Sequence, residues 1–287
     1  MKSTAKLMGF IRLMRPPNCL MMGFAVIVGA SVAIGGFPSE SLWLKLLFGF
    51  FTGFSLLAAS NALNDYWDRE IDAINEPNRP IPSGLVGPRE ALVFSALLTA
   101  FGLILAWLTS LECFLTAMLA ASLADAYVTL GKKTGLLGNA MVSICVAIPF
   151  AYGSIITVGR VEPLVAIFAS IAFLANLGRE VNKGIVDVPG DASKGIMTVA
   201  VRHGPKAAAY LASAFYLCAV GLSILPPLFS LVSWVYIPLV VLTDAGFIWA
   251  SASISRDQSR ENAKKVKNIV LIWMTTGMLA FLMGSST

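Results

Sequence analysis

Polar side chains gather on one face of the segment 61–72, which directly follows a long apolar run. On a helix, at 100° per residue, an arc of about 100° holds Asn61, Asn64, Asp65, Asp68 and Asp72. Carboxylates at this density repel one another unless a positive charge lies on them. His203 is the only histidine, so zinc chemistry is excluded and an oxygen-bound cation such as Mg²⁺ is favoured. The segment therefore predicts a metal site.

A second polar segment, 176–191, follows a later apolar run. On a helix, an arc of about 100° holds Asn176, Arg179, Glu180, Lys183 and Asp187. Pro189 and Gly190 are expected to break this helix, so that Asp191 folds back towards Asp187. Asp65 and Glu180 are 115 residues apart, as are the pairs Asn61–Asn176 and Asp72–Asp187. This spacing hints at duplicated helical hairpins whose two acidic groups face each other across one cavity.

The elements that carry these segments are predicted to be membrane-spanning helices. Of the 287 residues, 57% are hydrophobic and 13% charged, and the mean hydropathy is +0.77. Long apolar stretches recur along the whole chain, each of about the 20 residues that a helix needs to cross a bilayer. We expect an all-α, polytopic membrane protein, a single domain over 1–287, with spans at 19–36, 43–62, 90–110, 112–130, 137–157, 162–178, 206–226, 230–252 and 267–284.

The basic residues gather in alternate loops. Nineteen of the 21 lie within 2–15, 69–89, 132–133, 179–206 and 256–267, and only Lys45 and Arg160 lie elsewhere. The positive-inside rule then places the N-terminus and these loops in the cytoplasm and the C-terminus outside. Because the basic residues sit in short loops between spans, they suit lipid headgroups or anionic substrates and give no sign of nucleic-acid binding.

Five aspartates need a hydrated environment. Each costs about 2.5–3.5 kcal/mol at the bilayer centre, so together they would cost on the order of 15 kcal/mol if they faced lipid. The five are Asp65, Asp68, Asp72, Asp187 and Asp191. We therefore expect them to line a pocket at the cytoplasmic side, where Arg79, Lys132, Arg179 and Lys183 can contact an anionic ligand and divalent cations can neutralise the carboxylates.

At these residues the chain resembles the UbiA-type membrane prenyltransferase superfamily. Asn64, Asp65, Asp68 and Asp72 match its NDxxDxxxD signature, and Asp187 with Asp191 match its second, DxxxD-type run. The segment from Tyr127 to Lys132 and Lys133 resembles its conserved loop. Gly184 stands where many members have an additional aspartate. The resemblance covers nearly the whole chain, and it implies nine helices around a central cavity that opens at the cytoplasmic side.

The segments 15–21 and 178–187 resemble one archaeal branch of that superfamily. Its members transfer a geranylgeranyl group from geranylgeranyl diphosphate to the free hydroxyl of geranylgeranylglyceryl phosphate, which forms the second ether bond of archaeal membrane lipids. The resemblance thus implies these two substrates and two Mg²⁺ ions as the cofactor. It also implies that membrane lipid surrounds the protein and that no protein partner is obligatory.

The resemblance also implies residue roles. One ion would be held by Asn64, Asp68 and Asp72 and the other by Asp187 and Asp191. Asp65 or Glu180 would accept the proton of the attacking hydroxyl. The residues expected to bind substrate are Arg15, Asn18, Asn61, Arg79, Tyr127, Lys132, Lys133, Arg179 and Lys183.

Other functions stay open at this point. A prenyltransferase with an aromatic acceptor, in quinone, chlorophyll or haem synthesis, needs the same diphosphate site. Buried acids also mark ion pathways, but a transporter is disfavoured because the acids here cluster at one membrane face and are interleaved with bases. The hypothesis of a purely structural membrane protein does not explain two aligned groups of carboxylates.

Overall fold

The computed structural model describes residues 2–193 and 195–285, and over these the protein is all-helical. The helices are α1 (Lys2–Met14), α2 (Pro16–Ile34), α3 (Trp43–Asn75), α4 (Pro88–Thr109), α5 (Leu111–Thr129), α6 (Leu136–Val158), α7 (Pro163–Ser193), α8 (Val199–Ser223), α9 (Leu225–Leu228), α10 (Tyr236–Arg256) and α11 (Arg260–Gly284). Two short 3-10 turns, η1 (Glu40–Leu42) and η2 (Gly131–Thr134), join them. Within the described residues, nine helices are long and apolar enough to cross a membrane, which confirms the predicted fold class.

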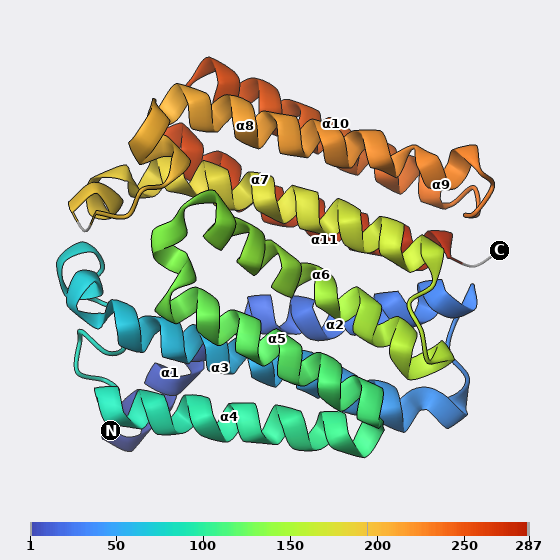
Figure 1. Ribbon diagram of the computed structural model, residues 1–287, viewed down its shortest axis with the longest axis horizontal. Helices are drawn as coiled ribbons and strands as arrows, with labels where there is room; N and C mark the ends of the chain where they lie inside the picture. Colours follow the sequence, from blue (N-terminus) through green and yellow to red (C-terminus); the bar gives the residue numbers. More distant parts are fainter. Residues whose placement is uncertain (1, 194, 286–287) are drawn as a thin grey trace.

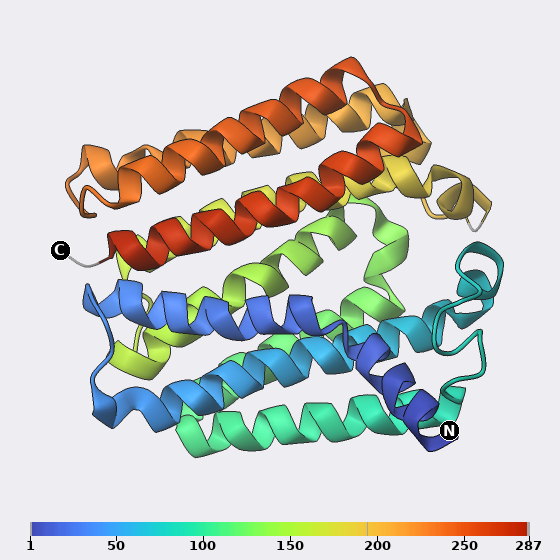
Figure 2. The same cartoon turned by 180° about the vertical axis from the view of Figure 1, so that it is seen from behind.

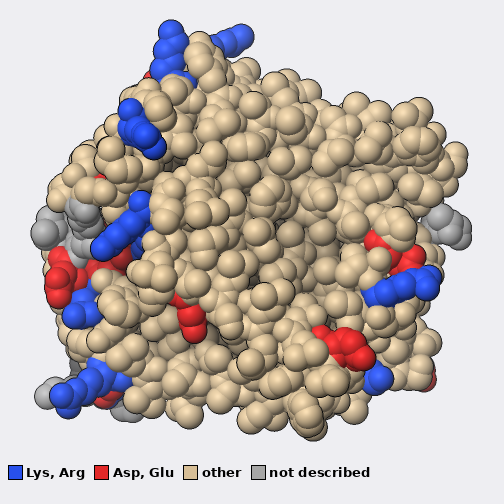
Figure 3. Space-filling model, in the orientation of Figure 1, with Lys and Arg blue, Asp and Glu red and all other residues tan. Residues whose placement is uncertain are grey.

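The spanning helices run back and forth along one direction, and the two termini lie at opposite ends of the bundle (Figures 1 and 2). On the face seen in Figure 3, charged side chains gather at the two ends and the broad band between them is largely uncharged. Side chains on this outer surface are exposed and apolar, as Leu97, Leu115 and Leu119 are. Such a band matches the hydrocarbon layer of a bilayer.

Two helices are longer than a bilayer requires. α3 has 33 residues and α7 has 31, so each is about 45–50 Å long at 1.5 Å per residue. The apolar part of each helix lies in the bundle, and the final turns carry the acidic segments beyond it. The long helices therefore hold both acidic groups at the same end of the molecule.

The expected break at Pro189 and Gly190 is wrong. α7 continues through both residues and ends at Ser193. A proline near the end of a long helix removes one backbone hydrogen bond, and the rest of the bundle contacts α7 up to this point: Arg260 Nε donates to the carbonyl oxygen of Val186, and Val188 packs against the core. Asp191 therefore lies one helical turn beyond Asp187 on the same face, and it does not fold back.

Glycines allow α2 and α6 to cross closely near their centres. A Cβ added to Gly29 would lie 2.1 Å from the carbonyl oxygen of Phe150, and one added to Gly153 would lie 2.0 Å from that of Val26. Small residues let membrane helices approach to backbone contact, where van der Waals packing replaces the missing hydrophobic drive between helices. This crossing fixes α2, which supplies one wall of the site.

The helix α1 was not anticipated from the sequence. Its Leu13 packs with Ala62 of α3 and with Val86 in the loop before α4. Arg15 separates α1 from α2 and has a φ of 55°, a left-handed conformation that costs a non-glycine residue on the order of 1–3 kcal/mol. Pro16 then starts α2. The chain therefore turns sharply at Arg15, which directs this side chain towards α3.

Candidate active site

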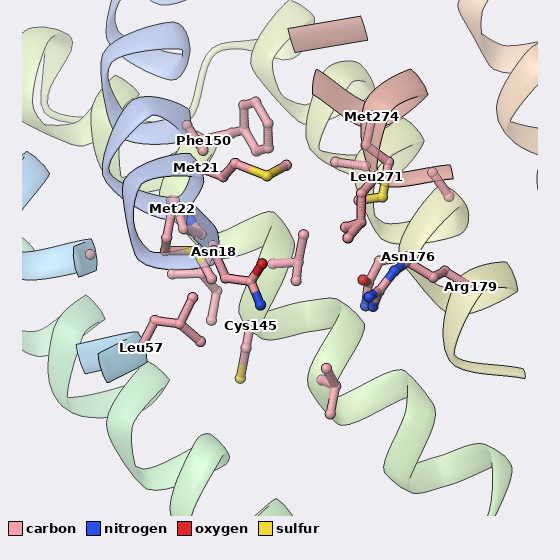
Figure 4. A pocket seen from close by; sticks show the side chains of 18 of the residues that line it. Asn18, Met21, Met22, Leu57, Cys145, Phe150, Asn176, Arg179, Leu271 and Met274 are labelled. Carbon is pink, nitrogen blue, oxygen red and sulfur yellow. The ribbon is translucent and has the colours of Figure 1, made fainter. Parts of the chain in front are cut away.

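The bundle encloses a cavity of about 450 Å³, a size typical of small-molecule sites. Met21, Phe150 and Met274 belong to its apolar wall (Figure 4). Asn18 on one side, and Asn176 and Arg179 on the other, extend into the same space (Figure 4). The cavity is therefore polar near one end and apolar along its depth.

Asp65 is the most enclosed carboxylate of α3, and two bases hold it. Arg15 Nη2 donates to Asp65 Oδ1 at 2.5 Å, and Arg79 Nη1 lies 3.5 Å from the same oxygen. Only 5% of the Asp65 side chain is exposed, so its charge depends on these partners. Arg12, Glu76 and Asn78 border a small hollow beside this pair.

The next two carboxylates of α3 are each held by a base from a different loop. Arg79 Nη1 donates to Asp72 Oδ2 at 2.6 Å, and Lys132 of η2 donates to Asp68. Asn64 Nδ2 donates to Asp68 Oδ2 at 3.1 Å, as neighbours one helical turn apart can. The loops before α4 and α6 thus close over the carboxylate face of α3.

Burial disfavours the charged forms of Asp72 and of Lys132. It raises the pKa of Asp72 above the ordinary aspartate value, although the guanidinium of Arg79 acts in the other direction. It also lowers the pKa of Lys132, against the attraction of Asp68. In each pair the charge of the partner therefore acts against the effect of burial.

On α7, Glu180 is held in the same manner as Asp65. Arg179 Nη1 lies 3.1 Å from Glu180 Oε1, and Lys183 Nζ lies 3.2 Å from Glu180 Oε2. The two positions 115 residues apart thus each hold a buried carboxylate between two bases. Asp187 and Asp191 follow on the extension of α7, partly exposed.

The carboxylates of α3 and those of α7 lie close enough to influence the same side chains. The charges of Asp68 on α3 and of Asp191 on α7 both reach the hydroxyl of Tyr127, which lies on α5. Lys132 likewise feels Asp68 on α3 and Lys183 on α7. Asn64 of α3 and Glu180 of α7 also line the same cavity, so the two acidic segments border one cavity.

The predicted site residues divide by position. Nine line the cavity: Arg15, Asn18, Asn61, Asn64, Arg79, Tyr127, Arg179, Glu180 and Lys183. Asp65 borders the neighbouring hollow, and the remaining six line neither of the two: Asp68, Asp72, Lys132, Lys133, Asp187 and Asp191. Lys133 is exposed, unlike its neighbour Lys132.

Sequence reasoning missed Lys267 as a site residue. It lines the cavity from α11, and its charge interacts with Asp187, Lys183 and Arg179. In the sequence it closes a run of five basic residues over 256–267 and looks like any other cytoplasmic anchor. No signal in the sequence separates it from Lys264 and Lys265.

The donor set fits Mg²⁺ bound together with a phosphate ligand. The described part of the chain contains no cluster of three or more acidic, histidine or cysteine side chains that could enclose a metal. Mg²⁺ usually takes one or two carboxylates and completes its six positions with water and substrate phosphate oxygens. Asp68 with Asp72, and Asp187 with Asp191, are such pairs, each one helical turn apart.

Fold and site together define an intramembrane enzyme class: a helical bundle with an apolar cavity, whose mouth is built to bind a highly charged head group. The model of the UbiA prenyltransferase family matches residues 22–277, and the chain belongs to that family. It is therefore a multi-pass membrane protein and a transferase of prenyl groups, as the sequence predicted, and the transporter and structural-protein hypotheses are set aside.

Its relatives point to one branch of the family. The digeranylgeranylglyceryl phosphate synthase of Korarchaeum cryptofilum is 35% identical, with 97% of each chain covered. That of Archaeoglobus fulgidus is 37% identical, with 95% of this chain and 94% of the relative covered. A solved structure of a digeranylgeranylglyceryl phosphate synthase in membranes is 32% identical and has a TM-score of 0.77, covering 98% of this chain and 99% of that chain.

A more distant structure shares the fold. A UbiA homologue from Archaeoglobus fulgidus, bound to GPP and Mg²⁺, has a TM-score of 0.66 at 18% identity, over 95% of this chain and 99% of that chain.

Proposed function

We propose that this enzyme transfers a geranylgeranyl group from geranylgeranyl diphosphate to the free hydroxyl of geranylgeranylglyceryl phosphate. One observation carries the proposal: two acidic groups, on α3 and α7, face each other with bases between them at the mouth of an apolar cavity. Such a site suits a substrate with an anionic head and a long apolar chain. The names of the relatives, which cover nearly the full chain, support this choice of substrates.

The chemistry divides between the two ends of the site. The bond between C1 of the prenyl group and the diphosphate oxygen breaks, and its electron pair leaves with the diphosphate. The acceptor hydroxyl oxygen bonds to C1 and gives up its proton. Arg15, Arg79 and Lys183 line the cavity near the diphosphate position and hold the developing negative charge. The apolar wall keeps water away from the electron-deficient carbon.

Two carboxylates are candidates for accepting the proton. Glu180 lines the cavity, whereas Asp65 borders the adjacent hollow. Each forms ion pairs with two bases, and a carboxylate is by its nature a weak base. A hydroxyl that has bonded to a carbocation is strongly acidic, so a weak base suffices, and Glu180 is the better placed of the two.

Mg²⁺ would be held by Asn64, Asp68 and Asp72 on one side and by Asp187 and Asp191 on the other, in two ions. When bound, it supplies positive charge that neutralises the leaving diphosphate. Asp68 and Asp72 pair with Lys132 and Arg79 in the structure. These two bases would stand beside the bound metal and would be the groups closest to the diphosphate on this side of the site.

The test is a product assay with purified protein in lipid nanodiscs. Labelled geranylgeranyl diphosphate and Mg²⁺ are offered with geranylgeranylglyceryl phosphate or with an aromatic acid acceptor. We expect label in a doubly prenylated glyceryl phosphate. Transfer to the aromatic acceptor alone would instead support the alternative function, a UbiA-type enzyme of quinone, chlorophyll or haem synthesis.

Paired variants test the metal assignment. Asp68→Asn and Asp187→Asn each remove one carboxylate charge, and each should lower turnover by a factor on the order of 10² or more. Glu70→Gln is the matched control, since Glu70 lies on α3 within two residues of Asp68 but is 84% exposed. Full activity in excess EDTA, or in either aspartate variant, contradicts the assignment.

We also propose that the acidic end of the bundle faces the cytoplasm. Nearly all basic residues lie at that end by chain position, as the positive-inside rule requires. Ser41→Cys in η1, in a background without native cysteines, should react with a membrane-impermeant maleimide in intact cells, and Glu70→Cys should not. The reverse labelling would invert the proposed orientation.

A further inference from the structure

A carboxylate lies deep in the apolar part of the cavity, far from the acidic mouth. Asp244 is on α10, eight residues from the outer end of that helix and twelve from Arg256 at the other end, which is about 12 Å and 18 Å along its axis. It lines the cavity together with Ser223 of α8 and Thr243. The deep, apolar part of the cavity therefore holds a carboxyl group.

Asp244 belongs to a small hydrogen-bonded cluster. Ser223 Oγ donates to Asp244 Oδ2 at 2.7 Å, and the hydroxyl of Tyr236 donates to the carbonyl oxygen of Ser223 at 3.0 Å. These contacts tie the end of α8 to α10 and fix the direction of the carboxyl group. Asp244 is partly exposed, and its exposed portion faces the cavity that it lines.

No base neutralises this group. Among the residues that the structure describes, the acid in every ion pair is a residue other than Asp244. An unpaired acid inside a membrane is costly and commonly marks a functional position. The roles proposed for the other carboxylates of the site, in binding metal and the charged head group, belong to the mouth. They do not explain Asp244.

The wall between the mouth and Asp244 is apolar. Along α11 the lining residues run from Lys267 at the mouth, through Leu271 and Met274, to Gly277, which lies next to Thr243. Gly277 is ten residues beyond Lys267, which is about 15 Å of helix. An isoprenoid chain with its head group at the mouth can lie against this wall, but its end cannot displace the water around a carboxyl group without loss of solvation.

We propose that Asp244, fixed by Ser223, forms a polar floor of the prenyl channel and limits the length of the prenyl chain that the enzyme accepts. The inference rests on the proposed function, because it concerns which chain lengths that reaction uses. Donor and acceptor both carry a prenyl chain with an anionic head, so the experiment separates the two.

The experiment measures kcat/KM in two series. In the first, farnesyl, geranylgeranyl and geranylfarnesyl diphosphate are offered with one acceptor. In the second, glyceryl phosphate acceptors carrying the same three chains are offered with one donor. For the wild-type protein we expect kcat/KM to fall by about tenfold or more from the geranylgeranyl to the geranylfarnesyl chain in one of the two series. That series identifies whether the donor or the acceptor chain occupies the channel.

Variants assign the drop to Asp244. Asp244→Leu keeps the number and branching of the side-chain heavy atoms without the polar group, and it should raise the ratio of kcat/KM for the geranylfarnesyl chain to that for the geranylgeranyl chain by about tenfold. In Asp244→Asn the amide oxygen can still accept the Ser223 hydrogen bond. This variant should keep the wild-type ratio of the two kcat/KM values within about twofold. A merely structural role would lower both rates and leave their ratio unchanged.

The outcomes separate cleanly. Equal use of geranylgeranyl and geranylfarnesyl chains by the wild-type protein in both series overturns the inference, and this needs no variant to fold. An unchanged ratio in a folded Asp244→Leu protein also overturns it, while the proposed function stands. Absence of any ether product from the wild-type protein would reject the proposed function itself, and the inference with it.

Discussion

Arg15 Nη2 lies 2.5 Å from Asp65 Oδ1, although the two residues are 50 positions apart in the chain. Arg15 reaches this position from a left-handed backbone conformation between α1 and α2. Strain of this kind persists only where the surrounding structure over-determines it. The ion pair therefore joins the start of the first span to the carboxylate face of α3 and fixes one corner of the cavity mouth.

Loss of Arg15 should destabilise the protein through its partner. Arg15→Ala leaves the buried Asp65 with only the longer contact to Arg79, which should cost about 1.5–3 kcal/mol in the free energy of unfolding. The double variant Arg15→Ala, Asp65→Ala should be more stable than the sum of the single effects predicts. Denaturant unfolding in detergent measures all three proteins.

The exposed pair Arg69–Glu70 is the control for this cycle. Glu70→Ala should change stability by about 0.5 kcal/mol or less, since the Glu70 side chain is 84% exposed and surface ion pairs contribute little. Additive effects of the Arg15 and Asp65 substitutions would contradict the coupling.

Neighbouring lysines should differ in function. Lys132 is partly buried and pairs with Asp68, whereas Lys133 is exposed. Lys132→Met should lower kcat/KM by about tenfold or more, because a base that contacts Asp68 is lost from the proposed diphosphate position. Lys133→Met should change it by less than about twofold, as expected for a surface charge. Initial rates at saturating Mg²⁺ decide this, and equal losses would contradict the distinction drawn by the structure.

Mg²⁺ binding should weaken on acidification sooner than for ordinary aspartates. Burial raises the pKa of Asp72, so this carboxyl takes up a proton at a higher pH than usual, and the protonated form is a poor metal ligand. The apparent affinity for Mg²⁺, measured by the metal-induced rise in Tm, should therefore fall as the pH drops from about 7 towards about 5.

Arg79 gives this titration a specific check. Its guanidinium favours the ionised form of Asp72, so Arg79→Gln should raise that pKa further and move the loss of Mg²⁺ affinity to higher pH. A shift to lower pH, or none, would show that Asp72 does not govern the titration.

The crossing of α2 and α6 should not tolerate a single added methyl group. In Gly153→Ala, the new Cβ would lie 2.0 Å from the Val26 carbonyl oxygen, and separating the helices should cost about 1–3 kcal/mol. Gly221→Ala on α8 is the matched control, because its Cβ would meet nothing within 4 Å and alanine favours a helix. Thermal unfolding should show a lower Tm for the first variant only; equal Tm values would mean that the crossing is loosely packed.

The sequence by itself determined the membrane fold and the local arrangement of the two acidic segments. Apolar runs of spanning length fix helices because the bilayer leaves no other way to satisfy backbone hydrogen bonds. Helical periodicity alone brings Asn64, Asp68 and Asp72 to one face of α3, since these residues are within two turns of one another. The family signatures rest on the same local spacing.

Only the tertiary structure decided which distant groups meet. Lys132 pairs with Asp68 while Lys133 does not, Lys267 reaches the cavity from α11, and Asp244 lines its apolar part. α7 continues through Pro189 because its neighbours hold it, whereas local chain rules predict a break. Periodicity fixes the direction of a side chain relative to its own helix. Contacts between helices depend on how side chains from the whole bundle pack together, and that information is not local.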